Sequence, residues 1–390
     1  MPGRGQCCDD LLAQFPDDVT LRAEATAKRA FFDGRWRDAA TAYAEWIARD
    51  PDSSEARFER AAALKAAGDT AAWERSLVDL KVDAGHRLAA EALQQALDAR
   101  RPKLSIVGEN RTASGYAGAR LLNLARDGGR MDVTRGAHGS LTFSATYERV
   151  RVSTPAAWRT GDFASVGVTA DLSTRTSLDG RAGLWVIGRG GMPDSRVGVL
   201  WNTTDRASLS AGFEMTPVLD NLATIDRGLV AKGPFAQARW STPNGGVEAR
   251  VSTATLQDGN RRSEVQGSIA HRLPVRGLQV MGWSSLTRNS RPSALYFSPD
   301  HFARVDVGLE YTRTFKPMRF ADDRQKTVRA TYLQGTDNRG TLYYHPAVTF
   351  ELPFSRQFAV SARGDWVRSA TYRETSVYVG LTYTAAGGTP

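Results

Sequence analysis

The polar side chains with the most regular spacing stand at alternate positions of short segments in the C-terminal two-thirds of the chain. The charged members of this set are Glu148, Glu248, Arg250, Arg272, Asp306, Glu310, Arg329, Arg363 and Asp365. Carboxylates and guanidinium groups on one face of a sheet can pair with one another, or they can hold a layer of water. We expect most of them to be structural and a minority to contact a solute on that face.

Residue patterns typical of catalysis are missing from the sequence. The adjacent pair Cys7 and Cys8 can build neither a zinc site nor a disulfide framework. No H-E-x-x-H or G-x-S-x-G motif occurs, and the glycine-rich stretches do not form a phosphate loop. The sequence therefore predicts no enzyme, no metal and no cofactor, and it assigns no ligand role to the histidines, which are His86, His138, His271, His301 and His345.

The alternating polar residues lie on predicted β-strands. Near the C-terminus Phe358, Val360 and Trp366 fall on one face, and Arg363 and Asp365 fall on the other. A period of two, interrupted by Gly, Asn, Asp and Pro, predicts a large antiparallel sheet. The expected strands are 139–152, 163–175, 179–190, 195–202, 205–215, 229–241, 246–257, 262–272, 277–288, 301–315, 325–335, 341–351, 356–369 and 372–384, with one or two more in 103–138.

One face of this sheet is rich in aromatic rings and the other is polar, which suits a transmembrane β-barrel of about 14–16 strands. A mean hydropathy of −0.38 does not oppose a barrel, because only every second residue faces lipid. Core packing in a soluble sheet is the alternative. The rings expected at the lipid interface are Trp158, Trp185, Trp201, Trp240, Trp283, Trp366, Tyr147, Tyr311, Tyr332 and Tyr383.

The first hundred residues have a different pattern, with alanine-rich amphipathic segments over 20–33, 37–49, 54–67, 70–81 and 86–100. Gly34 and Gly68 each end the first helix of a pair and are 34 residues apart, which is the tetratricopeptide spacing. We predict a helical tetratricopeptide-like domain over 1–101 and a barrel over 102–390. About three repeats are needed for independent stability. The domain is therefore either a protein-docking unit or the spacer-like remnant of a longer array.

Charge is unevenly placed along the chain. Residues 1–100 hold 14 Lys and Arg against 18 Asp and Glu, a net charge of −4. The total net charge of the chain is +9, so the remaining residues carry a net charge of +13. The basic residues are spread over many turns and do not cluster on one helix, so we expect no nucleic acid partner. Anionic lipopolysaccharide or an acidic polymer would fit such a surface. Residues 1–10 lack a secretory signal, and since a barrel requires export we expect the N-terminus to be incomplete.

The layout of helical repeats followed by a barrel resembles the outer-membrane exporters of bacterial exopolysaccharides, the cellulose branch most closely. Thr216–Leu222 resembles a Pro-Val-x-Asp-Ser loop of that branch, Leu256–Asn260 is similar to its Leu-x-x-Gly-Asn turn, and Leu295–Pro299 resembles its Tyr-Phe-Ser-Pro segment. Those exporters usually carry many repeats, whereas this chain has about two. The surface lipoprotein assembly modifiers, which combine a short repeat domain with a barrel, are a second resemblance.

The first resemblance implies a bacterial outer-membrane porin that exports an exopolysaccharide, with cellulose as the expected cargo. The second implies a translocator for surface lipoproteins or other proteins. A soluble carbohydrate-binding or surface adhesion protein is the alternative from a different class. The partners implied are outer-membrane lipid, a polysaccharide or secreted protein as cargo, and periplasmic or inner-membrane secretion proteins that bind the repeat domain.

Overall fold

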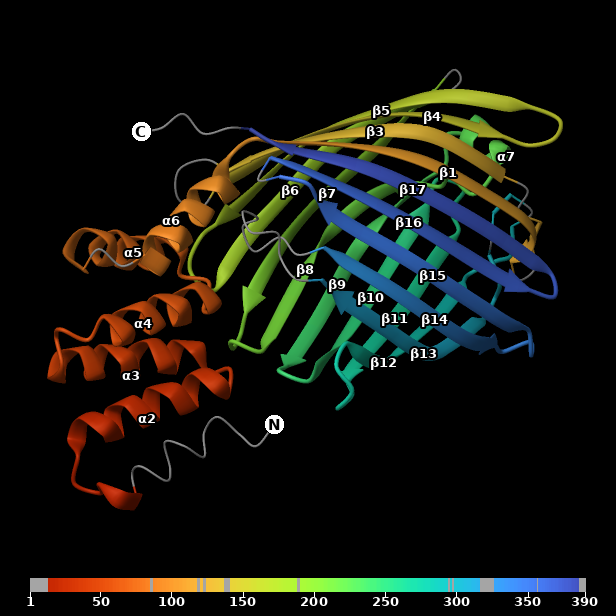
Figure 1. The fold of residues 1–390 in the computed structure, drawn as a ribbon. Coiled ribbons are helices and arrows are strands. Elements are labelled where there is room, and N and C mark those ends of the chain that lie inside the picture. Colours follow the sequence, from red (N-terminus) through yellow and green to blue (C-terminus); the bar gives the residue numbers. More distant parts are fainter. Residues whose placement is uncertain are drawn as a thin grey trace.

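The computed structural model describes residues 13–385, apart from residues 85–86, 118–119, 122–123, 137–140, 188–189, 294, 297, 316–325 and 356. Some residues named above therefore lie outside the described part, namely Cys7, Cys8, His86, His138 and Phe297. The described chain forms a bundle of helices followed by one large β-sheet, and the two are adjacent in space (Figure 1).

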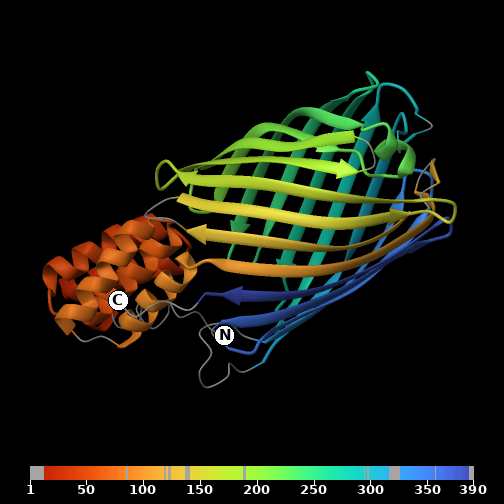
Figure 2. The same cartoon turned by 90° about the horizontal axis from the view of Figure 1, so that it is seen from above.

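The helical region contains consecutive antiparallel helices, each packed on the next (Figure 2). Their bounds are α2 (Val19–Phe32), α3 (Trp36–Arg49), α4 (Ser54–Ala66), α5 (Thr70–Ala84) and α6 (Arg87–Arg100). Side-chain caps begin three of them: Asp18 accepts a hydrogen bond from the Leu21 amide, Ser53 accepts one from the Ala56 amide, and Asp69 accepts one from the Ala72 amide. Gly34 and Gly68 follow α2 and α4 with φ of 71° and 83°. These glycines end the first helix of each pair, as the sequence predicts.

Small residues allow the helices to approach closely, and a few large side chains fill the remaining space. Tyr43 is 1% exposed and stacks on Trp46 with ring centroids 6.1 Å apart. Burial and a hydrogen bond with Glu59 raise the pKa of Tyr43, and burial raises the pKa of Glu59. Phe32, at the end of α2, is 47% exposed and lies outside this core.

The sheet has 17 strands, and the two-residue β2 only extends the hairpin between β1 and β3, so 16 long strands remain. They are β1 (Lys103–Ala117), β3 (Leu124–Gly136), β4 (Leu141–Ser153), β5 (Trp158–Asp171), β6 (Thr176–Ile187), β7 (Gly190–Asn202), β8 (Ala207–Pro217), β9 (Val230–Thr242), β10 (Gly245–Leu256), β11 (Arg261–Arg272), β12 (Leu278–Asn289), β13 (Phe302–Thr314), β14 (Thr327–Asp337), β15 (Leu342–Pro353), β16 (Phe358–Ser369) and β17 (Tyr372–Thr384), with β2 at Arg120–Leu121. A short helix, α7 (Leu222–Asp226), lies between β8 and β9.

The sheet closes on itself through its first strand. Lys103 of β1 pairs with Thr384 of β17 on one side and with Thr134 of β3 on the other. All other long strands pair antiparallel with their neighbours in the sequence. Because no long strand is left with a free edge, the molecule is a closed 16-stranded antiparallel β-barrel. The predicted fold class is confirmed, and the strand number is the upper value of the expected range.

The two faces of the wall differ as the period of two predicts. On β13 Val305, Val307 and Leu309 point outward and are 53%, 60% and 48% exposed. Asp306 and Glu310 alternate with them and are only 2% and 8% exposed inside the barrel. An apolar outer face and a polar inner face are typical of a barrel surrounded by lipid.

Most of the predicted interface aromatics do point outward, but two do not. Trp185 pairs with Phe163, 4.7 Å away between ring centroids, in a buried cluster inside the barrel. Trp283 pairs with the inward-facing Asp306, and the Arg304 guanidinium lies 5.7 Å from its ring. The expectation that these two rings face lipid is wrong, because an inner wall also uses rings as partners for loops and arginines.

The barrel has two different ends. The N-terminal end of β1 follows α6, so the helical region lies at this end, which we call the proximal end (Figure 1). Most connections between strands are short here, for example residues 203–206, and the exception is the 12-residue connection between β13 and β14. At the opposite, distal end, longer loops over 218–229 and 290–301 join the strands.

Candidate functional site

The inner wall of the barrel is the candidate functional site. Strand register places all nine charged residues singled out from the sequence on this inner face, because each pairs across strands with other inward-facing residues. A barrel of 16 strands is wide enough to leave an aqueous channel. The arrangement is therefore that of a polar, hydrated lumen.

Most of these charges lie against a group of opposite sign. Arg250 donates to Glu214 at 2.6 Å, and Arg363 donates to Asp365 at 2.7 Å. Arg329 lies 3.5 Å from Glu310. The remaining members of the set are placed as follows: Glu148 pairs with Arg126, Asp306 pairs with Arg304, Arg272 donates to the Pro243 carbonyl, and Glu248 stands opposite Arg239 and Ser268. Charges of both signs alternate along the wall, so neither sign dominates it.

The most deeply buried of these carboxylates shows how the wall is built. Asp306 is 2% exposed and accepts from the Arg304 guanidinium at 2.9 Å. Gly335 stands opposite Asp306 across β13 and β14, and a Cβ at this position would collide with the carboxylate. The guanidinium also lies over the Tyr343 ring, 4.1 Å from its centroid. The pair is thus held between an aromatic ring and a glycine that gives it room.

We expect the substitution Asp306→Asn to make the lumen more selective for anions and to destabilise the barrel by about 2 kcal/mol, because Arg304 loses its counter-charge. Reversal potentials in a salt gradient and thermal unfolding measure the two effects. Asp162→Asn is the matched control, since Asp162 faces outward and is 45% exposed. Equal reversal potentials in the two variants would exclude an electrostatic role of Asp306 in the channel.

Sequence reasoning missed several residues of the inner wall. Arg126 pairs with Glu148 and lies 3.6 Å from Glu109. These side chains and Tyr378 line a recess of about 330 Å³ in the wall. The segment around Arg126 has few apolar residues, so its alternation was too weak to identify its inward positions. Only the register with β1 and β4 assigns them.

At the distal end a loop folds back into the barrel. Residues 218–229 carry α7, and Ile225 packs against the inward-facing Val150, Trp185 and Met192. The loop is also held by charge, because Arg159 of β5 donates to Asp226 at 2.9 and 3.0 Å. An apolar cluster inside an otherwise polar lumen therefore anchors a loop that narrows the distal mouth.

The second distal loop packs on the first around a buried asparagine. Asn260 is fully buried and donates to the Arg291 carbonyl at 2.9 Å and to the Tyr296 hydroxyl at 2.8 Å. Its carbonyl oxygen accepts from Ser290 at 2.8 Å. Burial raises the pKa of Tyr296, so this hydroxyl remains a neutral donor, and it donates to Asp258. These bonds fix the loop over 290–301 to the turn over 257–260.

The three segments with a resemblance to the cellulose exporters meet here. Asn221, from the first segment, donates to the Leu295 carbonyl of the third at 2.6 Å. Val218, Leu256 and Tyr296 form one buried cluster that joins all three. Residues 74 positions apart, Asn221 and Leu295, are thus joined in a single closure at the distal mouth.

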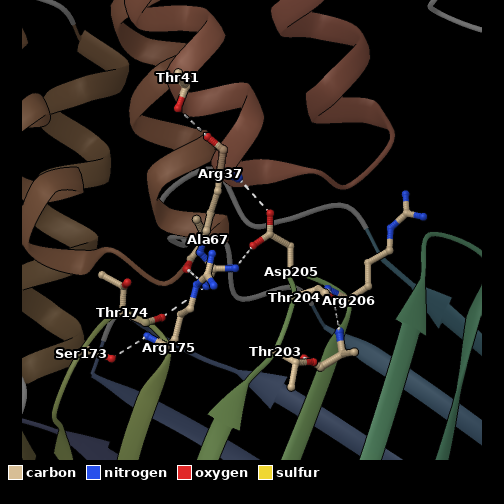
Figure 3. Close-up of polar contacts among 11 residues, drawn as sticks. Arg37, Thr41, Ala67, Ser173, Thr174, Arg175, Thr203, Thr204, Asp205 and Arg206 are labelled. Carbon is tan, nitrogen blue, oxygen red and sulfur yellow. Dashed lines mark hydrogen bonds and ion pairs between the residues drawn. The ribbon is translucent and has the colours of Figure 1, made fainter.

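Arg37 connects the helical region to turns at the proximal end of the barrel (Figure 3). The amide of Arg37 donates to Asp205 at 2.9 Å, and the Arg37 guanidinium forms an ion pair with the same carboxylate. The guanidinium also donates to the carbonyls of Ala67 and Thr174, at 3.3 and 3.4 Å. Arg37 therefore joins the helix turns to two turns of the barrel.

Gly34, in the turn beside this contact, lies close to the side chain of a barrel residue. Gly34 has a φ of 71°, and a Cβ there would lie 3.1 Å from Nε of Arg206 in the turn between β7 and β8. The positive φ favours glycine, and a Cβ at this position would require the Arg206 side chain to shift by a few tenths of an ångström. The residue that ends α2 therefore also leaves room for the Arg206 side chain.

Within the described ranges, no group of three His, Cys, Asp or Glu residues is placed to hold a metal ion. Of the described helices, none combines the length and the apolar character needed to cross a bilayer.

No protein-family model and no curated protein matches this chain. Among solved structures, one described as a bacterial polysaccharide outer membrane secretin is similar over 74% of this chain and 99% of its own length, with a TM-score of 0.59 and 14% identity. The fold is that of an outer-membrane β-barrel. A BenF-like porin from Pseudomonas fluorescens Pf-5 covers 73% of this chain and 98% of its own, with a TM-score of 0.42 and 7% identity. The CymD monoaromatic hydrocarbon channel covers 75% and 91%, with a TM-score of 0.40 and 9% identity.

The likeness to the secretin concerns the architecture of the outer-membrane barrel alone, because only 14% of the aligned residues are identical. The two more distant likenesses add nothing to it. What the barrel could transport has to be argued from its own inner wall.

Proposed function

We propose that this chain is an outer-membrane channel that exports an uncharged exopolysaccharide such as a cellulose-like glucan. The observation that carries the proposal is the pairing of opposite charges on the inner wall, for example Arg250 with Glu214 and Arg363 with Asp365. A wall with paired charges of both signs holds water without a strong field of either sign. It offers hydrogen-bond donors and acceptors to a hydroxyl-rich polymer and neither attracts nor traps a charged one.

One aromatic ring on the inner wall fits the same cargo. Trp283 faces the lumen and is only partly buried, with the Arg304 guanidinium 5.7 Å from its ring. Tyr343 and Phe235 are each 3% exposed beneath arginines, so their faces are not open to a sugar. Sugar rings have apolar faces that pack against aromatic rings, while their hydroxyl groups bond to charged side chains. The structure of similar architecture is described as a polysaccharide secretin, which supports a polymer over a small solute as the cargo.

The same proposal implies an orientation of the barrel in the membrane and a role for the helical region. In outer-membrane barrels the short turns face the periplasm and the longer loops face outside. The proximal end, with residues 1–101 as a tetratricopeptide-like docking domain, would then bind a periplasmic or inner-membrane secretion partner. Residues 102–390 would form the channel, with the closure around Asn260 on the outer surface.

The proposal predicts that neutral β-linked gluco-oligosaccharides block the ion current through the reconstituted channel. We expect Trp283→Ala to shorten the blocked time about fivefold, since one stacking contact contributes about 1 kcal/mol. Trp240→Ala is the matched control, because Trp240 is 51% exposed on the outward face. Single-channel recording with graded oligosaccharide concentrations gives the blocked time.

Three results would count against this function. Block by anionic oligosaccharides alone would exclude an uncharged cargo, and block by unfolded peptides alone would favour protein translocation. Recovery of the chain without detergent, with no heat-dependent shift in gel migration, would favour a soluble carbohydrate-binding protein over a barrel in the membrane.

A further inference from the structure

Two arginines face each other on the outside of the barrel at its distal end. Arg368 of β16 pairs directly with Arg373 of β17, and both side chains are exposed on the outward face. Their other cross-strand neighbours on that face are Tyr344 and Ser114. Like charges directly opposite each other destabilise a sheet. Within the described part of the chain no carboxylate pairs with either guanidinium to offset this repulsion.

The height of this arginine pair on the barrel can be inferred from the residues that precede Arg368 on β16. On the outward face of β16 the side chains from Phe358 to Trp366 are apolar or absent, and they cover about 26 Å of tilted strand. Because strands in such barrels tilt by about 35–45°, this length corresponds to a height of about 20 Å, which is most of an apolar band about 25 Å tall. Trp366 and Tyr344, which are 43% and 39% exposed, are aromatic residues of the kind found at the headgroup level. The arginine pair comes one outward position beyond Trp366.

A second basic position lies on the same side of the barrel at the same end. Arg149 and Arg151 of β4 also face outward, and the Arg151 guanidinium lies 5.2 Å from the ring of Trp158. From β16 to β4 there are four strand spacings, or about 19 Å. The basic outer surface therefore extends across this part of the rim, although Arg149 has Asp162 4.0 Å away and Arg368 and Arg373 have no such carboxylate.

We propose that Arg368 and Arg373 bind a phosphate of the phosphorylated glycolipid (lipid A) in the outer leaflet. Guanidinium groups bind phosphate through paired hydrogen bonds, and one phosphate between them converts repulsion into two attractions. The height just beyond Trp366 is that of lipid headgroups, and long arginine side chains can extend along the barrel toward them. The proposal rests on the outer-membrane location in the proposed function, but it does not depend on the cargo.

The test is binding of lipid A to the purified full chain in detergent, followed by native mass spectrometry. We expect diphosphorylated lipid A to bind about tenfold more tightly than its dephosphorylated form. The variant Arg368→Gln with Arg373→Gln should lose this preference. The double variant Arg135→Gln with Arg313→Gln, which removes outward arginines at the proximal end, should keep it.

Two further measurements make the test decisive. Arg368→Lys with Arg373→Lys should keep part of the preference, because lysine retains the charge but not the paired geometry. Equal binding of both lipids by the wild-type chain would overturn the proposal. Millimolar inorganic phosphate that displaces lipid A completely would also overturn it, because the site would then bind any free anion. Channel conductance, measured on the same samples, reports on the proposed export function separately.

Discussion

The variant Asn260→Leu is expected to open the distal mouth. The side chain of Asn260 makes hydrogen bonds to Ser290, Arg291 and Tyr296, and leucine has a similar volume but can form none of them. The Arg291 amide also donates to the Asn260 carbonyl oxygen, so the variant loses four bonds. At about 1 kcal/mol each, this destabilises the closed arrangement by about 4 kcal/mol. The population with displaced loops then rises about a thousandfold. Single-channel conductance should increase, and bulky antibiotics should enter cells that express the variant.

The control for this change is Asn110→Leu. Asn110 lies on the outward face in the middle of β1, where it donates to Asp127 at the barrel surface. The same substitution there should leave conductance at the wild-type value. If Asn260→Leu conducted like Asn110→Leu while its loops became more accessible to protease, the loops would not limit the channel.

Asp205→Ala is expected to release the helical region from the barrel while the barrel remains folded. The Asp205 side chain is 9% exposed and the Arg37 side chain is 23% exposed. Breaking a buried pair costs several kcal/mol, and we reduce this to about 2 kcal/mol because solvent reaches Arg37. The detached population should rise about thirtyfold. Hydrogen exchange at residues 36–38 and 203–206 should become faster.

Asp33→Ala provides the comparison for this variant. Asp33 pairs with Arg35 at 3.2 Å in the neighbouring turn, and its side chain is 60% exposed. Its removal should not change exchange in the barrel turns. Heat-dependent gel migration should be the same in both variants, since neither residue belongs to a strand. Unchanged exchange in Asp205→Ala would mean that the helices are held by other contacts.

The hydrogen bonds of Asn260 and the ion pair of Arg37 with Asp205 suggest how the two ends of the barrel differ in function. At the distal end the closure depends on neutral, buried hydrogen bonds around Asn260, which salt does not screen. At the proximal end the attachment depends on an ion pair that is only partly buried. A secretion partner with a stronger basic or acidic surface could compete with that ion pair, and the helical region would then move without disturbing the strands.

The helices and strands follow largely from the sequence, because local patterns determine them. Gly34 and Gly68 mark the helix ends through their positive φ, and the alternation of Phe358 to Trp366 identifies a strand with two unlike faces. Expected bounds agree with the observed ones to within a few residues, except for β5 and β7, which begin at Trp158 and Gly190 where residues 163 and 195 were expected. The turn before β5 contains Pro155 and lacks the alternation that marks a strand start.

The amino-acid sequence by itself determined the period of two, the helical first hundred residues and the polar character of one strand face. Only the tertiary structure decided that the sheet closes at 16 strands, that Trp185 and Trp283 point inward, and that Asn260 joins two loops. The physical reason is the range of the interactions. Alternation is a property of neighbouring residues, whereas closure, loop packing and the contact of Arg37 with Asp205 join residues that are far apart in the chain.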